Sequence, residues 1–143
     1  MVPTITTLLK LSTALGVPVN FFVEEDDTPP EPIHYTDGDK RSPVFTPHKG
    51  LDLEGITGSY KNFRSAAAIA TMQPGATSGG KLLKHPGEEL VHVTSGTVCF
   101  HIGGNEYLLK TGDSLQFSGA VPHQWANLTD KPVQMIWMVL RNE

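Results

Sequence analysis

The sequence predicts a mainly β domain, an antiparallel sandwich or barrel, preceded by a short helical segment. From about residue 44 onward, apolar and polar residues alternate in short runs, as strands with one buried face require. Glycine, proline and asparagine separate these runs, which is typical of tight turns between antiparallel strands. The 143 residues suffice for one ordinary domain with its own core and a short appendage.

Seven runs are candidate strands, over residues 44–48, 66–72, 89–94, 97–102, 106–110, 114–117 and 133–140. In the fourth run, Phe100 alternates with Cys99 and His101, so we expect Phe100 on the opposite sheet face from the other two. Gly96 and Gly112 lie at turns where a positive φ is expected. Replacing either glycine is therefore predicted to impair folding.

Two segments precede the β region. Residues 1–23 have the punctuation of short helices, with Pro3 at an entry and Gly16 as a stop, and are predicted to be the remnant of a larger helical domain. Residues 24–43 combine acidic side chains with four prolines and are predicted to form an extended linker. The β-barrel domain is accordingly expected over residues 44–143.

Composition and charge exclude several classes of protein. The net charge is −4, of which five acidic residues over 24–31 contribute −5, so the rest sums to +1. This near-neutral remainder has no Lys/Arg cluster for strong nucleic-acid binding. No apolar stretch is long enough to span a membrane, and Lys10 inside the first apolar segment argues against a secretory signal. Cys99 is the single cysteine, so no intrachain disulfide can form, and we expect a cytoplasmic protein.

Three side chains form the strongest candidate site. His85 and Glu89 are four residues apart, and His123 follows on a later strand that could face them across a barrel. Two imidazoles and a carboxylate suit a divalent first-row metal such as zinc, iron, manganese or nickel. The alternative is a hydrogen-bonded polar cluster without an ion. Trp125 shares the parity of His123 and is predicted either to line the pocket or to fill the core.

The segment HPGEELVHVTSG (85–96) resembles the first motif of the cupin superfamily, G-x5-H-x-H-x(3,4)-E-x6-G. His85 holds the place of the second histidine, Glu89 that of the glutamate, and Gly96 that of the last glycine. Leu83 occupies the place of the first histidine. Cupins typically hold a metal with these two histidines, the glutamate and a later histidine, so the resemblance implies three of four ligands here.

The segment GDSLQFSGAVPHQWAN (112–127) resembles the second cupin motif, G-x5-P-x-G-x2-H-x3-N. The first glycine, the histidine and the asparagine are present as Gly112, His123 and Asn127. Ser118 stands in place of the proline and Ala120 in place of the internal glycine. The resemblance implies a double-stranded β-helix, also called a jelly-roll barrel, with His123 as the last ligand.

Two further segments narrow the resemblance. HPGEE together with MQPGATSG (72–79) is similar to the cupin domain at the C-terminus of bacterial Xre-type helix-turn-helix transcriptional regulators. PTITTLLKLSTALGVPVNFF (3–22) resembles the end of the Xre-type DNA-binding domain, whose recognition helix would precede residue 1. The implied DNA contact is thus made through helix-turn-helix residues mostly missing from this sequence.

These observations predict a domain that senses a small molecule or a metal. His85, Glu89, His123 and Trp125 are the predicted ligand-binding residues, and the first three are the predicted metal ligands. Occupancy would control DNA binding by an upstream helix-turn-helix domain in a homodimer. One alternative is a small metal-dependent cupin enzyme, a dioxygenase or isomerase with a site of two histidines and one glutamate. Another is a dimerisation domain with a vestigial pocket.

Overall fold

A computed structural model gives the fold of residues 32–44, 46–58 and 62–141. The predicted helical segment 1–23 and the start of the predicted linker lie outside the described residues, so both stay predictions. None of the described residues belongs to a helix long and apolar enough to cross a membrane.

The described part of the chain forms nine strands. They are β1 (Pro43–Val44), β2 (Leu51–Gly55), β3 (Ser65–Met72), β4 (Glu88–Ser95), β5 (Val98–Ile102), β6 (Asn105–Leu109), β7 (Ser114–Ser118), β8 (His123–Ala126) and β9 (Val133–Leu140). The prediction of a mainly β domain is confirmed.

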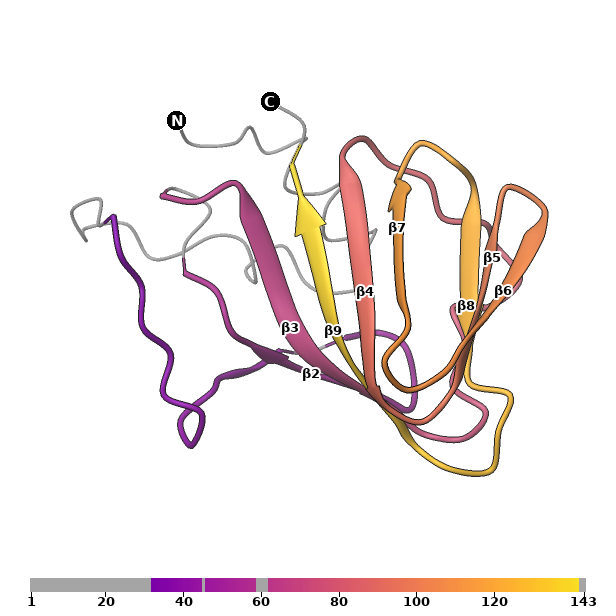
Figure 1. Ribbon diagram of the computed structural model, residues 1–143, viewed down its shortest axis with the longest axis horizontal. Coiled ribbons are helices and arrows are strands. Elements are labelled where there is room, and N and C mark those ends of the chain that lie inside the picture. Colours follow the sequence, from indigo (N-terminus) through magenta and orange to yellow (C-terminus); the bar gives the residue numbers. More distant parts are fainter. Residues whose placement is uncertain (1–31, 45, 59–61, 142–143) are drawn as a thin grey trace.

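The strands build two antiparallel sheets. The larger has the order β1-β2-β3-β9-β4-β7, and the smaller has the order β6-β5-β8. In Figure 1 the smaller sheet lies on the right, beyond β7. The loop segment before β4 extends the smaller sheet, because Thr77 and Leu83 form bridges with Ala126 and His123 of β8.

Strand alternation produces the core between the sheets. In β9, every second side chain from Val133 to Val139 is buried, and the residues between them are more exposed. The same period brings Phe100 of β5 and Trp125 of β8 inward from the opposite sheet. Burying an apolar side chain of this size stabilises the fold by about 1.5–3 kcal/mol, so this alternation supplies the main driving force.

The structure corrects three details of the predicted strands. Leu51–Gly55 is a strand that the sequence pattern did not predict, His123–Ala126 gives bounds to the strand expected at His123, and the expected strand 44–48 is reduced to Pro43–Val44. Both strands are short, since β2 alternates over residues 51–54 alone and β8 has four residues, two of them polar. They are held by neighbours distant in the sequence, β3 for one and β5 for the other, which local patterning does not reveal.

Turn glycines behave as predicted at the two positions singled out. Gly96 has a φ of +94° and Gly112 a φ of +92°, a region that other residues rarely adopt. At Gly96 a Cβ would also lie 2.8 Å from the backbone oxygen of Pro132, so this turn has no room for a side chain.

Candidate metal and ligand site

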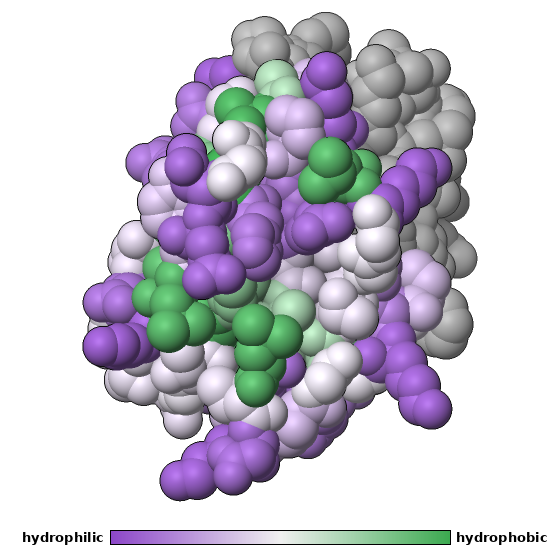
Figure 2. Space-filling model, turned by 90° about the vertical axis from the view of Figure 1, so that its right-hand side faces the viewer, coloured by the Kyte–Doolittle hydropathy of each residue, from purple (hydrophilic) through white to green (hydrophobic). Residues whose placement is uncertain are grey.

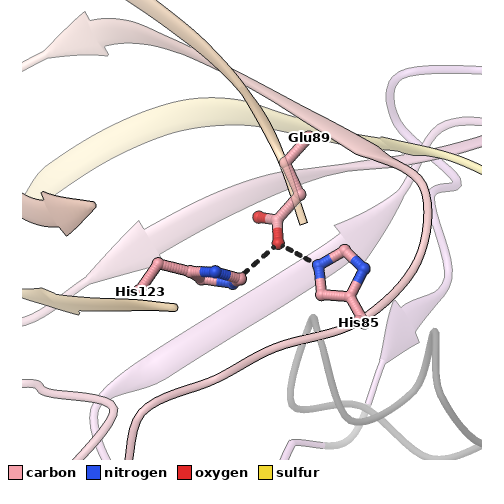
Figure 3. Close-up of side chains that lie close together, drawn as sticks. All are labelled: His85, Glu89 and His123. Atoms are coloured by element: carbon pink, nitrogen blue, oxygen red, sulfur yellow. Dashed lines mark hydrogen bonds and ion pairs between the residues drawn. The ribbon is translucent and has the colours of Figure 1, made fainter. Parts of the chain in front are cut away.

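Three buried polar side chains meet where β4 and β8 begin (Figure 3). Glu89 takes the first inward position of β4, His123 is the first residue of β8, and His85 lies in the loop that leads into β4. Their exposed fractions are 1% for Glu89, 0% for His123 and 4% for His85. The sequence predicted that these three residues would converge, and the structure brings them together.

The carboxylate of Glu89 is the centre of the cluster. Its Oε2 lies 2.6 Å from His85 Nε2 and 3.1 Å from His123 Nε2. Its Oε1 accepts a hydrogen bond of 2.7 Å from Trp137 Nε1. In the sequence, Trp137 looks like an ordinary core residue of an apolar strand, and only the pairing of β4 with β9 places it beside Glu89. One carboxylate oxygen is thus anchored by an indole, and the other faces both imidazoles.

Backbone carbonyls determine which ring nitrogen of each histidine carries the proton. His85 Nδ1 lies 2.8 Å from the carbonyl of Pro86, and His123 Nδ1 lies 2.8 Å from the carbonyl of Val121. A carbonyl only accepts, so each Nδ1 must donate. In the neutral rings both Nε2 atoms therefore present lone pairs toward Glu89. Lone pairs facing a carboxylate oxygen require a proton or a cation between them.

The ionisation of the cluster follows from its close contacts. Burial alone would raise the pKa of Glu89, but the two histidines outweigh this effect and lower it. For His123, burial alone would lower the pKa, but the contact with Glu89 and the hydrogen bond to Val121 raise it. In the absence of a metal, the cluster therefore favours an ionised carboxylate beside a protonated His123.

A glycine makes room for the His85 ring. A Cβ at Gly119 would lie 2.1 Å from Cε1 of His85, far closer than any real contact. The backbone of Gly119 also accepts a hydrogen bond of 2.8 Å from the His85 amide and donates one of 2.8 Å to the carbonyl of Gly87. In the second cupin motif the internal glycine falls at position 120, which is Ala120 here, whereas the glycine beside His85 is Gly119, one position earlier.

The place of the missing cupin histidine is beside His123. Leu83 and His123 exchange two backbone hydrogen bonds of 2.8 and 3.0 Å, so their side chains lie on the same face of the sheet. Leu83 packs against the hydrophobic core, and the ring of Phe117 lies 4.9 Å from that of His123 on another side. The cluster is therefore enclosed by apolar neighbours, one of which occupies the position of the fourth ligand.

The donor set fits a divalent metal ion. Among the described residues, these three side chains can bring one ligand atom each within 4.8 Å of one another. His123 Nε2 is buried without a hydrogen-bond partner, because its contact with Glu89 is poorly directed. Donation of each Nδ1 to a carbonyl is the arrangement that fixes metal-binding imidazoles through Nε2. Three protein ligands are one fewer than the four of a structural zinc site, so a bound ion would need water or a small molecule to complete its coordination.

Trp125 lies inward, as its parity predicted, but it packs as a core residue. Its ring lies 5.6 Å from Trp137 and 5.1 Å from His48, both edge-on. Its Nε1 is buried without a hydrogen-bond partner. Trp125 therefore reaches the cluster through Trp137, which contacts Glu89.

Asn127, the last residue of the second motif, has a structural role. Its Nδ2 donates to the carbonyls of Met72 at 3.0 Å and Lys131 at 2.8 Å, and its Oδ1 accepts from the amide of Thr129 at 3.0 Å. These bonds close the turn between β8 and β9. Asn127 thus helps to hold β8, which carries His123.

Known proteins are similar to this chain in sequence and in structure. The HTH-type transcriptional regulator PuuR of Escherichia coli (strain K12) is 30% identical over 125 residues, covering 87% of this chain and 66% of that protein. The chain thus spans just under two thirds of the length of this relative. Among solved structures, the cupin domain of an XRE family transcriptional regulator from Enterobacter cloacae is 21% identical with a TM-score of 0.59, covering 66% of this chain and all of the other.

Enzymes also share the fold. A sugar phosphate isomerase of the cupin superfamily from Silicibacter pomeroyi is 21% identical with a TM-score of 0.60, covering 74% of each chain. At this identity the likeness concerns the fold alone. The family model described as the cupin domain matches residues 68–139, which include all three residues of the buried cluster. The chain therefore belongs to the cupin family, and its two antiparallel sheets form the cupin fold that its motifs implied.

Proposed function

We propose that this chain is the effector-sensing domain of a cytoplasmic HTH-type transcriptional regulator. We further propose that His85, Glu89 and His123 hold a divalent first-row metal, zinc, iron, manganese or nickel, within its effector site. The relationship to PuuR and to the XRE family cupin domain supports the regulator. Because the chain spans only 66% of PuuR, DNA binding is assigned to a helix-turn-helix domain of the whole regulator.

One observation carries the metal site. His123 Nε2 is fully buried and lies 3.1 Å from Glu89 Oε2, the same oxygen that lies 2.6 Å from His85 Nε2. In the neutral rings both Nε2 lone pairs face one carboxylate oxygen, an arrangement that needs a proton or a cation between the atoms. A cation between Glu89 and the two histidines would satisfy all three ligand atoms together.

The chain's own residues perform the binding. Trp137 holds Glu89 Oε1 and leaves Oε2 for the ion, while Pro86 and Val121 keep both Nε2 atoms unprotonated when the rings are neutral. A bound metal would act as a Lewis acid with open positions for an anionic or amine group of the effector. The apolar enclosure would strengthen that interaction by excluding water.

Sensing requires only that the effector prefers one arrangement of the regulator. A ligand shifts an equilibrium by the difference in its affinity for the two states, and no reaction is needed. We propose that the two states are arrangements of a homodimer whose DNA-binding domains respond to occupancy of the barrels. Light scattering of the purified protein at several concentrations tests the dimer, and a monomer at all of them would contradict it.

Metal calorimetry tests the proposed site. Zn²⁺ is titrated into the Cys99→Ser protein, so that the thiol does not compete, and then into the same protein with Glu89→Gln added. Glu88→Gln is the matched control, because Glu88 is exposed and contacts Gln116 on the surface. We expect one equivalent of Zn²⁺, lost with Glu89→Gln and retained with Glu88→Gln. Absence of Zn²⁺ binding, or equal binding by both variants, would contradict the metal site and favour the alternative of a hydrogen-bonded polar cluster without an ion.

The proposal of a transcriptional regulator and the alternative of a metal-dependent enzyme lead to different expectations. The regulator predicts about 40–60 in-frame residues of helix-turn-helix sequence before Met1 in the genome, the amount needed to complete such a domain. It also predicts that the purified protein binds effectors without consuming them. Metal-dependent oxygen consumption or isomerisation of a small substrate, abolished by Glu89→Gln, would favour the enzyme instead.

A further inference from the structure

A second group of metal-binding side chains lies on the outer face of the smaller sheet. Cys99 and His101 alternate with Phe100 along β5, so they face away from the core. Glu106 of β6 is the direct register partner of His101. Strand alternation alone places only Cys99 and His101 on this face, and two donors are too few for a metal. The antiparallel pairing adds the third.

The three side chains are in contact. Cys99 Sγ lies 3.9 Å from His101 Nδ1, and His101 Nε2 lies 3.2 Å from Glu106 Oε2. One ligand atom from each can be chosen so that all lie within 4.8 Å of one another. In tetrahedral zinc sites with bonds of about 2.0–2.3 Å, ligand atoms lie roughly 3.3–3.6 Å apart. Small side-chain movements would therefore bring these three donors to coordination distances.

The three donors differ in their exposure to solvent. Cys99 is only 1% exposed, whereas the side chains of His101 and Glu106 are 45% and 62% exposed. Figure 2 shows this side of the molecule, where hydrophilic side chains lie among apolar ones. Leu108, the register partner of Cys99 on β6, is one of the exposed apolar residues here. A covered thiol thus has two movable ligands that reach solvent.

We propose that Cys99, His101 and Glu106 form a second metal site, specific for a thiophilic divalent ion such as Zn²⁺, with water as the fourth ligand. A thiolate, an imidazole and a carboxylate are the ligand types that zinc uses in proteins. This site does not depend on the buried cluster, because the two face opposite sides of the smaller sheet. A regulator carrying it would respond to zinc through its outer surface.

Binding would replace a proton by the metal. Burial and the nearby charge of Glu106 raise the pKa of the Cys99 thiol, so the free protein carries a neutral thiol. When Zn²⁺ binds, the S–H proton passes to solvent or buffer and the sulfur electron pair forms the Zn–S bond, with no change in oxidation state. The affinity is consequently expected to increase with pH.

Cobalt titration tests the site directly. The chain has one cysteine, so a thiolate-to-cobalt charge-transfer band in the near ultraviolet can report only Cys99. We expect Co²⁺ to produce this band in the wild-type protein and excess Zn²⁺ to remove it. His101→Ala and Glu106→Gln should each weaken the affinity by about tenfold or more, judging from the effects of perturbing metal shells. Glu89→Gln, which alters the buried cluster, should leave the band unchanged.

Three results would overturn the proposal. The first is no thiolate band at excess Co²⁺ in the reduced wild-type protein. The second is a band whose midpoint is unchanged in both His101→Ala and Glu106→Gln, which would mean that Cys99 binds alone. The third is a band lost with Glu89→Gln in a protein that remains folded. Both surface variants replace exposed side chains, so the test does not rely on Cys99→Ser folding normally.

Discussion

Replacing Gly119 by alanine should disrupt the buried cluster through a single methyl group. The new Cβ would lie 2.1 Å from Cε1 and 2.4 Å from Nδ1 of His85. Since carbon atoms ordinarily approach to about 3.5–4.0 Å, the ring must retreat by roughly 1 Å or more. That retreat breaks the contact of 2.6 Å between His85 and Glu89.

The expected loss in the free energy of unfolding depends on the contacts that Glu89 retains after the His85 ring has moved. Breaking a buried ion pair typically costs about 3–5 kcal/mol, and overpacking costs about 1–3 kcal/mol. Glu89 retains Trp137 and His123, so we expect a loss of about 2–4 kcal/mol in the free energy of unfolding. Zinc affinity at the cluster should fall by about 100-fold, since four ligands share about 10–16 kcal/mol in structural zinc sites.

Urea unfolding and zinc calorimetry measure these two losses. Gly80→Ala is the matched control, because a Cβ there meets nothing within 4 Å, and neither Gly80 nor Gly119 has a positive φ. The control should differ from the wild type by less than about 1 kcal/mol. If Gly119→Ala matched Gly80→Ala in both assays, the packing of His85 against Gly119 would be refuted.

Three further predictions concern two neighbours of the cluster and the pH dependence of the cluster itself. Leu83→His should supply the missing cupin ligand and raise zinc affinity by calorimetry about 100-fold, and unchanged affinity would contradict the placement of Leu83 beside His123. Trp137→Phe should lose a hydrogen bond to a charged group and destabilise the protein by about 1.5–3 kcal/mol in urea unfolding; a smaller change would mean that Glu89 does not depend on the indole. In metal-free protein, the pKa of Glu89 is lowered, so this group stabilises the fold at pH values above its ordinary pKa of 4.5, and the stability is lost as the pH falls through the folded pKa. The pKa of His123 is raised, so this group stabilises the fold at pH values below its ordinary pKa of 6.5, and the stability is lost as the pH rises through the folded pKa. Urea midpoints should therefore be highest between these values, and His123→Ala should remove the alkaline decline.

The fold was predictable where the period of two is strong. In the run 97–102, Val98, Phe100 and Ile102 alternate with more polar residues, so the inward face is evident without a structure. The four-residue β8 carries two polar side chains, one of which points inward, so alternation alone could not identify it. The helical prediction for residues 1–23 and the domain boundaries remain predictions.

The site was predictable only in part, because its completion depends on strand register. His85, Glu89 and His123 follow from motif spacing, and the structure brings them together. Trp137 and Glu106 are different, since a tryptophan in an apolar strand and a glutamate in a hairpin carry no local signal of their role. Their positions follow from the pairing of β4 with β9 and of β5 with β6. Such cross-strand neighbours change with a shift of one residue.

A crystal structure of the protein soaked with Zn²⁺, with anomalous data collected at the zinc edge, tests the central claim most directly. We expect a peak within about 2.0–2.2 Å of His85 Nε2, His123 Nε2 and a carboxylate oxygen of Glu89. A map at saturating Zn²⁺ with no peak there, and with both imidazoles still turned to Glu89, would contradict it.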